Sequence, residues 1–68
     1  MEKRIASELM AEVVKLSAQL NVVMDKIEEV EPEADLLAMR RHACAVMAAC
    51  DEHLFRPIVS RYPELEPH

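Results

Sequence analysis

The stretch IEEVEPEADLL, residues 27–37, decides the fold because it separates two long apolar repeats. A residue that precedes a proline is disfavoured in the helical conformation, so we expect Glu31 to form the corner between two helices. Pro32 suits the first position of a helix, and Glu33 and Asp35 suit its positive N-terminal end. The connection is therefore only a few residues long, and short connections join helices that lie antiparallel.

An unbroken apolar repeat with spacings of three and four fills the half of the chain before this corner. Its members are Ala6, Leu9, Val13, Leu16, Leu20, Val23, Ile27 and Val30. This pattern is typical of an amphipathic helix, which we place at about residues 2–30. A weaker stripe lies beside the first. It consists of Met10, Val14, Ser17, Asn21 and Met24.

Two neighbouring stripes also mark the half of the chain after the corner, which predicts a helix over about residues 32–56. The stripe expected to face the first helix is Leu36, Met39, Ala43, Val46 and Cys50. The other stripe is Leu37, Arg40, Cys44, Met47, Asp51 and Leu54. A helix with two apolar seams has two neighbours, and a single hairpin supplies only one of them.

The second of these stripes reads almost the same in both directions, which favours antiparallel pairing with a copy of itself. In such a pair, Arg40 would lie near Asp51 of the other copy at both ends of the seam. Leu37 would meet Leu54, and Cys44 would meet Met47. These six residues form the predicted oligomer interface. The alternative is that Arg40 and Asp51 simply face solvent and that the dimer seam lies on the first helix, through Met10, Val14, Ser17 and Met24.

These patterns predict an all-α fold: an antiparallel two-helix hairpin that forms a four-helix bundle as a homodimer, or a higher oligomer such as a tetramer. The hairpin domain would cover residues 1–62. Pro57 should end or kink the second helix, and residues 57–62 could form a short third helix or turn. Residues 63–68 read as a C-terminal tail. The layout over residues 2–56 is similar to that of the plasmid copy-number regulators that form antiparallel four-helix dimers and bind paired RNA loops. This resemblance is architectural and transfers no site residue.

Size and composition limit the classes of function. A chain of 68 residues buries little surface alone and usually needs a partner or another source of stability. Cys44 and Cys50 lie about 9 Å apart along one helix, too far for a bridge, and free thiols indicate a reducing compartment, most simply the cytoplasm. The net charge of −5 disfavours binding to nucleic acid or to an anionic membrane. No apolar run approaches the roughly 20 residues of a membrane-spanning helix.

Two sets of side chains offer alternatives to a purely structural role. Cys50 and His53 form a Cys-x-x-His pair on one helix, and a second copy could complete a zinc site or cofactor site. The core-packing alternative for Cys50 is a small apolar residue in the seam. Arg40, Arg41, Arg56 and Arg61 could instead contact an RNA or DNA backbone. The chain has only two aromatic residues, Phe55 and Tyr62, and neither lies beside Arg40 and Arg41 to stack on bases, so surface pairing with carboxylates is the simpler interpretation.

The sequence contains no arrangement of nucleophile and base that predicts catalysis, and we expect neither an enzyme nor a bound cofactor. The leading hypothesis is a small, non-enzymatic oligomerisation and protein-interaction module with an adaptor or regulatory role. Its partners would be further copies of the chain and an unidentified protein. The alternatives left open are a metal- or cofactor-binding bundle and a regulator associated with nucleic acid.

Overall fold

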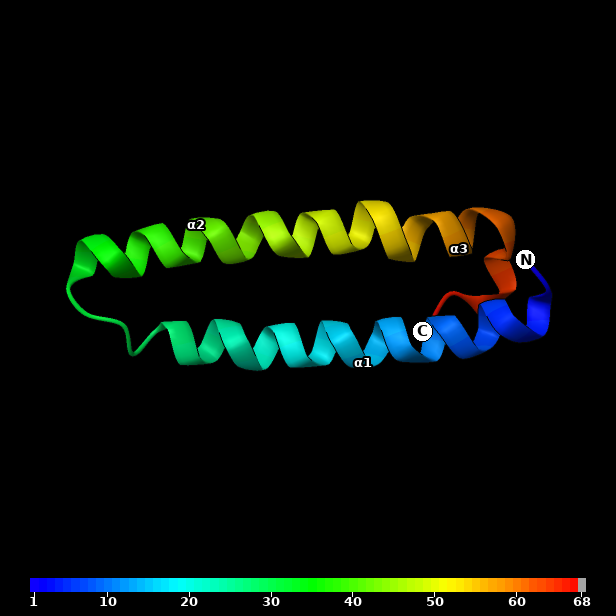
Figure 1. The fold of residues 1–68 in the computed structure, drawn as a ribbon, viewed down its shortest axis with the longest axis horizontal. Coiled ribbons are helices and arrows are strands. Elements are labelled where there is room, and N and C mark those ends of the chain that lie inside the picture. The colour runs from blue at the N-terminus through cyan, green and yellow to red at the C-terminus, as the bar shows by residue number, and fades with distance from the viewer. Residues whose placement is uncertain (68) are drawn as a thin grey trace.

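The computed structural model describes residues 1–67, which form helices and no strands, so the predicted all-α class is confirmed (Figure 1). α1 spans Lys3–Ile27, and α2 spans Glu33–Cys50 and runs back alongside it. A π-helical turn, Asp51–Phe55, leads directly into α3, Arg56–Arg61. A 3-10 turn, Pro63–Leu65, follows α3. None of the helices within residues 1–67 is long and apolar enough to cross a membrane.

The corner between α1 and α2 lies where the proline predicted it. α1 ends at Ile27 rather than Val30, because the chain tightens there into bonds that span three residues. The N–H of Val30, for example, donates to the carbonyl of Ile27 at 2.9 Å. Pro32 is the extended residue at the N-terminal boundary of α2, and its peptide bond with Glu31 is cis. Glu33, rather than Pro32 as predicted, is therefore the first residue of the helix.

The second helical arm consists of α2, the π-helical turn and α3, and it continues through Pro57 because a wider turn accommodates the proline. In a regular α-helix its ring would collide with the carbonyl four residues earlier, and it has no N–H to donate. The π turn lies immediately before it, and the N–H of Arg56 bonds there to the carbonyl of Asp51, five residues back. The helical alternative for residues 57–62 is therefore confirmed through Arg61, where α3 ends.

The π turn also changes which side chains point toward α1. An extra residue in one turn rotates everything after it by about 100° relative to an uninterrupted helix. Leu54, which would continue the stripe of α2, is exposed, and Phe55 is half-buried in its place. Ile58 is only 2% exposed and joins the buried cluster. The turn thus brings α3 into contact with α1.

The seam between the two arms lies between the predicted stripes rather than along one of them. Within residues 1–67 the buried apolar side chains are Ala6, Met10, Val13, Ile27 and Ile58. The half-buried members of the seam are Ser17, Leu20, Met24, Leu36, Ala43, Met47 and Cys50. The apolar face of each helix is broader than one neighbour can cover, so its outer edge stays exposed. Met39 and Val46 lie on that edge, which corrects the prediction that they face α1.

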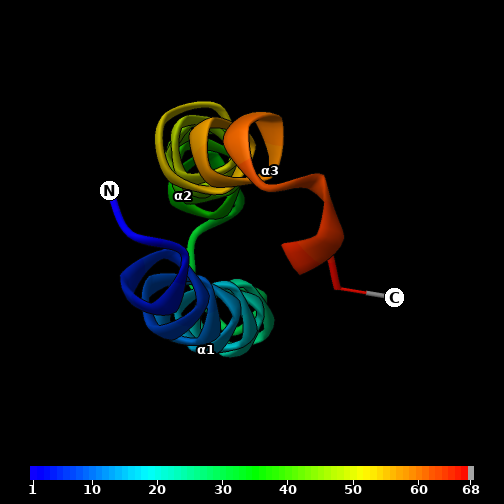
Figure 2. The same cartoon turned by 90° about the vertical axis from the view of Figure 1, so that its right-hand side faces the viewer.

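The segment after α3 folds back over one side of the hairpin (Figure 2). Leu65 packs against the buried cluster, and the Lys3 ammonium lies 3.0 Å from the Glu64 carboxylate. The hydroxyl of Tyr62 donates a hydrogen bond to the carbonyl of Met1. The predicted tail is therefore partly packed, although its last residue, His68, lies outside the described residues. The whole hairpin measures 47 × 18 × 16 Å.

Candidate functional site

One long side of the hairpin is covered by the chain itself, and we call it the closed side. The C-terminal segment lies over it at the end near the termini. Near the corner, the guanidinium of Arg40 binds Glu28 with two hydrogen bonds, one of them 2.8 Å from Nε to Oε2. These bonds lower the pKa of Glu28 below its ordinary value and raise the pKa of Arg40. Ion pairs and the folded-back segment thus occupy both ends of this side.

A related electrostatic effect marks the folded-back segment. The pKa of Glu64 is lowered, first because the backbone N–H of Glu64 donates to its carboxylate and second because Lys3 does so. The pair joins α1 to the 3-10 turn across sixty residues of sequence, whereas Arg40 and Glu28 join the two sides of the corner. All four side chains are close to half exposed or more, so water screens both pairs.

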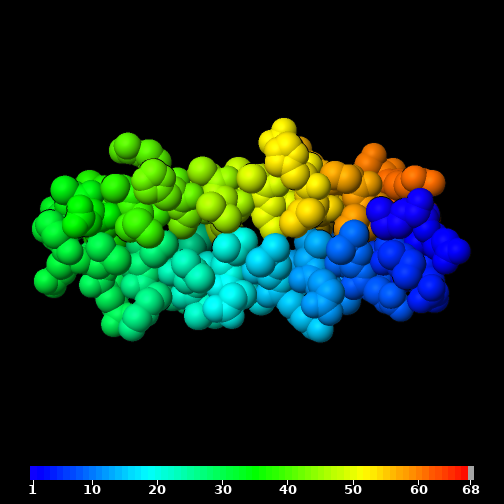
Figure 3. Space-filling model, in the orientation of Figure 1, coloured from blue at the N-terminus to red at the C-terminus, as the bar shows by residue number. Residues whose placement is uncertain are grey.

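Residues 1–67 place no such cover over the opposite long side, and we call it the open face. Figure 3 views this side, where α1 and α2 lie next to each other. Its large apolar side chains are 39–52% exposed. They are Ile5, Leu9, Leu16 and Val23 of α1, and Met39 and Val46 of α2. Because successive helical residues turn by 100°, the four α1 residues share one direction. The open face is therefore a nearly continuous apolar strip along the hairpin.

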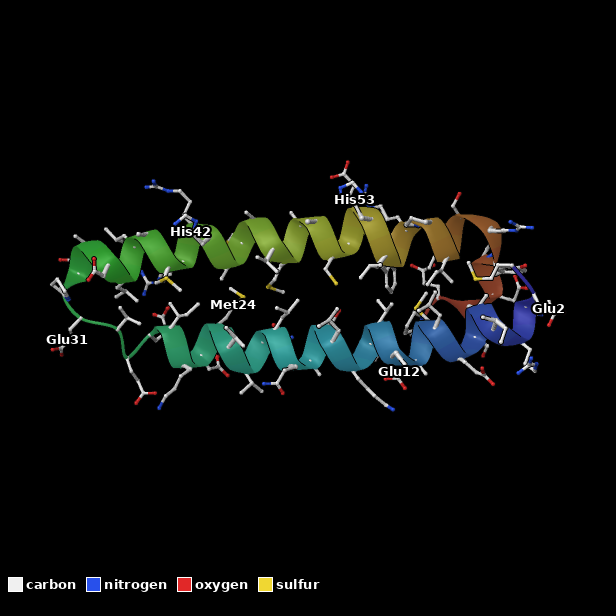
Figure 4. The ribbon with its side chains drawn as sticks, in the orientation of Figure 1. Glu2, Glu12, Met24, Glu31, His42 and His53 are labelled. Carbon is white, nitrogen blue, oxygen red and sulfur yellow. The ribbon has the colours of Figure 1, made fainter. Side chains whose placement is uncertain are left out.

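Two hollows lie along the open face. The first, of about 170 Å³, runs between the helices and is lined almost wholly by apolar atoms from Val23, Met39, Val46 and their seam neighbours. An apolar space of this size can accept a whole side chain or a molecule as large as benzene. The second is shallower and lies beside Ile5 and Leu9. Figure 4 shows Met24 pointing from α1 into the space between the arms, at the level of the first hollow.

The predicted oligomer interface lies on the closed side, and its two charged members already have partners within the chain. Arg40 binds Glu28, and the Asp51 carboxylate lies 2.7 Å from Nε of Arg56. Leu37, Cys44 and Leu54 are exposed, and Met47 is half-buried in the seam. A dimer through this stripe would have to exchange both pairs for contacts between copies. The interface stays a prediction.

The candidate metal pair is divided between the seam and the surface. Cys50 is half-buried and lines a third hollow, with Ser17 and Phe55. His53 is exposed and points away from α1 (Figure 4), with its Nε2 atom 4.0 Å from the Glu52 carboxylate. Within residues 1–67, no three His, Cys, Asp or Glu side chains gather in a group that could hold a metal ion. Cys50 and His53 would therefore need ligands from a second copy.

The four candidate arginines lie in two groups toward opposite ends of the second arm. Arg41 and Arg56 are fifteen residues apart, which corresponds to about 22 Å along a helix. Arg40 and Arg56 have carboxylate partners, and the guanidinium of Arg61 lies 5.8 Å from the centre of the Tyr62 ring. One chain therefore does not gather these residues into a single basic patch.

Comparisons with protein-family models, with curated proteins and with solved structures found no match for this chain. We therefore infer the function from the surfaces of the hairpin itself. Sequence reasoning placed the apolar residues of the open face within the seam stripes, except Ile5, which belonged to no predicted stripe. The signal that could have found them is the presence of two adjacent stripes on each helix, since one neighbouring helix covers only the region between them.

Proposed function

We propose that this chain is a small, non-enzymatic helical module that works by self-association and protein interaction, as an adaptor or regulatory subunit. Two hairpins would form a four-helix bundle, and a tetramer would arise by pairing again. The observation that carries this proposal is that α2, eighteen residues long, has no buried residue although it packs against α1. A helix in this position needs a second neighbour to bury its apolar side chains.

The character of the surface supports a binding role rather than catalysis. The hollow of about 170 Å³ between the helices is lined almost wholly by apolar atoms, and the ionisable groups with shifted pKa values belong to the surface pairs Arg40–Glu28 and Lys3–Glu64. A catalytic site usually holds such groups in a pocket, away from water. The two free thiols, Cys44 and Cys50, favour a reducing compartment, and we place the protein in the cytoplasm.

Sedimentation equilibrium of the purified chain at micromolar concentration tests the proposal. We expect a mass of two or four chains, with a dissociation constant that can be measured by dilution. A monomer at all concentrations would contradict self-association. Recovery of a stable complex with a protein partner would then be the remaining support for an interaction module.

A further inference from the structure

We infer that the open face binds a second copy of this chain, with α2 of the second copy lying antiparallel along α1 and both corners at the same end of the assembly. This inference rests on the proposed self-association and identifies the surface and the occupant. It differs from the interface predicted from the palindromic stripe, which lies on the closed side.

The surface area that the chain exposes beyond that of a compact monomer is similar to the area that each partner buries in a stable dimer. The chain exposes 5173 Å². A compact monomer of its 7.8 kDa mass exposes about 4,400 Å², so the hairpin carries roughly 800 Å² in excess. A stable protein–protein interface of standard size buries about 800 Å² on each partner. One additional copy is therefore enough to remove the excess from water.

The spacing of the apolar residues fits α2 of a second copy. Leu16 and Val23 lie seven residues apart on α1, and Met39 and Val46 lie seven apart on α2. When the helices run antiparallel, Val23 meets Met39 of the second copy and Leu16 meets its Val46 in one register. A two-fold axis along the length of the hairpin then repeats both contacts. Every helix in this bundle has antiparallel neighbours, as in common four-helix bundles.

The alternative with the corners at opposite ends leaves part of the face uncovered. It would place α2 against α2 of the second copy, with Met39 facing Val46 and the symmetry axis near Ala43. Ala43 lies beside Leu20 of α1. From Leu20, α1 continues only seven residues to Ile27, whereas Ile5 lies fifteen residues in the other direction. Ile5 would therefore extend past the end of the other α1 and stay exposed.

Two matched pairs of substitutions test which side binds the second copy. Val23 and Val14 of α1 are 43% and 42% exposed, and Val46 and Leu37 of α2 are 52% and 48% exposed. The members of each pair are nine residues apart, which places them on opposite sides of their helix. Only Val23 and Val46 belong to the open face. Each of the four residues is changed to Asp, and the dissociation constant of the dimer is measured by sedimentation.

We expect Val23→Asp and Val46→Asp to weaken the dimer by at least about tenfold, because a carboxylate would lose its water on association. Val14→Asp and Leu37→Asp should change the constant by less than about threefold, since their side chains stay in water. Far-UV circular dichroism of all four variants confirms that the helices remain. The reverse order of effects, or four equal effects, would overturn the inference and leave self-association standing. A monomeric wild-type chain would overturn both.

Cross-linking at the corner tests the arrangement of the two copies. In a chain whose Cys44 and Cys50 are replaced by alanine, Glu31→Cys places one thiol on each corner. With both corners at one end, a short bismaleimide should join the copies within the dimer. If the corners lay at opposite ends, the thiols would be separated by most of the 47 Å length of the hairpin, and no cross-link would form. A dimer that resists cross-linking would therefore overturn this arrangement.

Discussion

The closed side and the open face belong to the same two helices, and they differ mainly in what the rest of the chain lays over them. On the closed side, Leu65 and the Lys3–Glu64 pair cover the end near the termini, and Arg40 bridges to Glu28 near the corner. The open face has apolar side chains of similar exposure, and nothing in the described part of the chain covers them. Within residues 1–67, the segment that follows α3 covers one side of the hairpin and leaves the other side exposed.

The largest effect should come from the residue that anchors α3 beneath the closed side. Ile58→Ala removes most of a side chain that is 2% exposed, so we expect the free energy of unfolding to fall by about 2–5 kcal/mol. Val22→Ala, on the exposed outer surface of α1, is the control and should change it by less than about 0.5 kcal/mol. Urea unfolding at one fixed protein concentration measures both. Equal losses would show that α3 does not contribute to the core.

A smaller loss of stability should distinguish Leu65, which covers the closed side, from Leu54, which is exposed. Leu65 is half-buried against the core cluster, so Leu65→Ala should cost about 1–2 kcal/mol of unfolding free energy. Leu54 is 40% exposed because of the π turn, and Leu54→Ala should cost less than about 0.5 kcal/mol. Thermal melting of the two variants gives the comparison. A greater loss at Leu54 would mean that the register after Asp51 is wrong.

A charge-swap series asks whether the closed side also binds a second copy. If Arg40 paired with Asp51 of another chain, Arg40→Asp and Asp51→Arg would each weaken the dimer, and the double swap would restore it. Because both residues already have partners within the chain, we expect less than a twofold change in the dimer dissociation constant for each variant. Sedimentation of the three variants decides between the palindromic stripe and the open face.

The smallest effect concerns acid. The folded chain holds the pKa of Glu28 below the ordinary value of 4.5, so its pairing with Arg40 stabilises the fold fully above about pH 4.5. This contribution is lost as the pH falls through the lowered pKa of Glu28. Glu28→Gln and Arg40→Gln should therefore both flatten the acid side of the stability profile relative to the wild type. An unchanged slope in both variants, measured by urea unfolding between pH 5 and 3, would contradict the closing role of this pair.

Local rules were enough to predict the all-helical class and the corner. A proline that separates two apolar repeats indicates a break between two helices, and Pro32 lies where the chain turns. The same kind of rule did not decide between the alternatives at Pro57, because the cost of a proline inside a helix can be avoided by widening the turn before it. Whether that happens depends on contacts such as those of Ile58 with α1, which are distant in sequence.

The orientation of the helices was harder to predict than their positions. Leu9, Leu16 and Val23 match the seam pattern as well as Val13 and Leu20 do, because spacings of three and four fit two neighbouring stripes equally. The choice between them depends on which helix rotation packs Met10 against α3 and Met24 against α2. The residues of the open face were equally hard to predict, since they are the residues that the helix rotation leaves exposed. The sequence alone indicates Cys50, His53 and the four arginines as candidate binding residues. That these side chains do not come together within one chain follows from their positions around and along the helices.

The π turn displaces the repeat of side chains along the second helical arm by one residue. A helix that binds along α2 can follow one repeat of side chains for the eighteen residues from Glu33 to Cys50, a distance of about 27 Å. Beyond Asp51 the repeat is out of step, and the same binding helix would meet a different set of side chains. The shift therefore limits how long a matching helix can be. The extra residue in this turn also means that Ile58 reaches the core one position later in the sequence than it would in a regular α-helix.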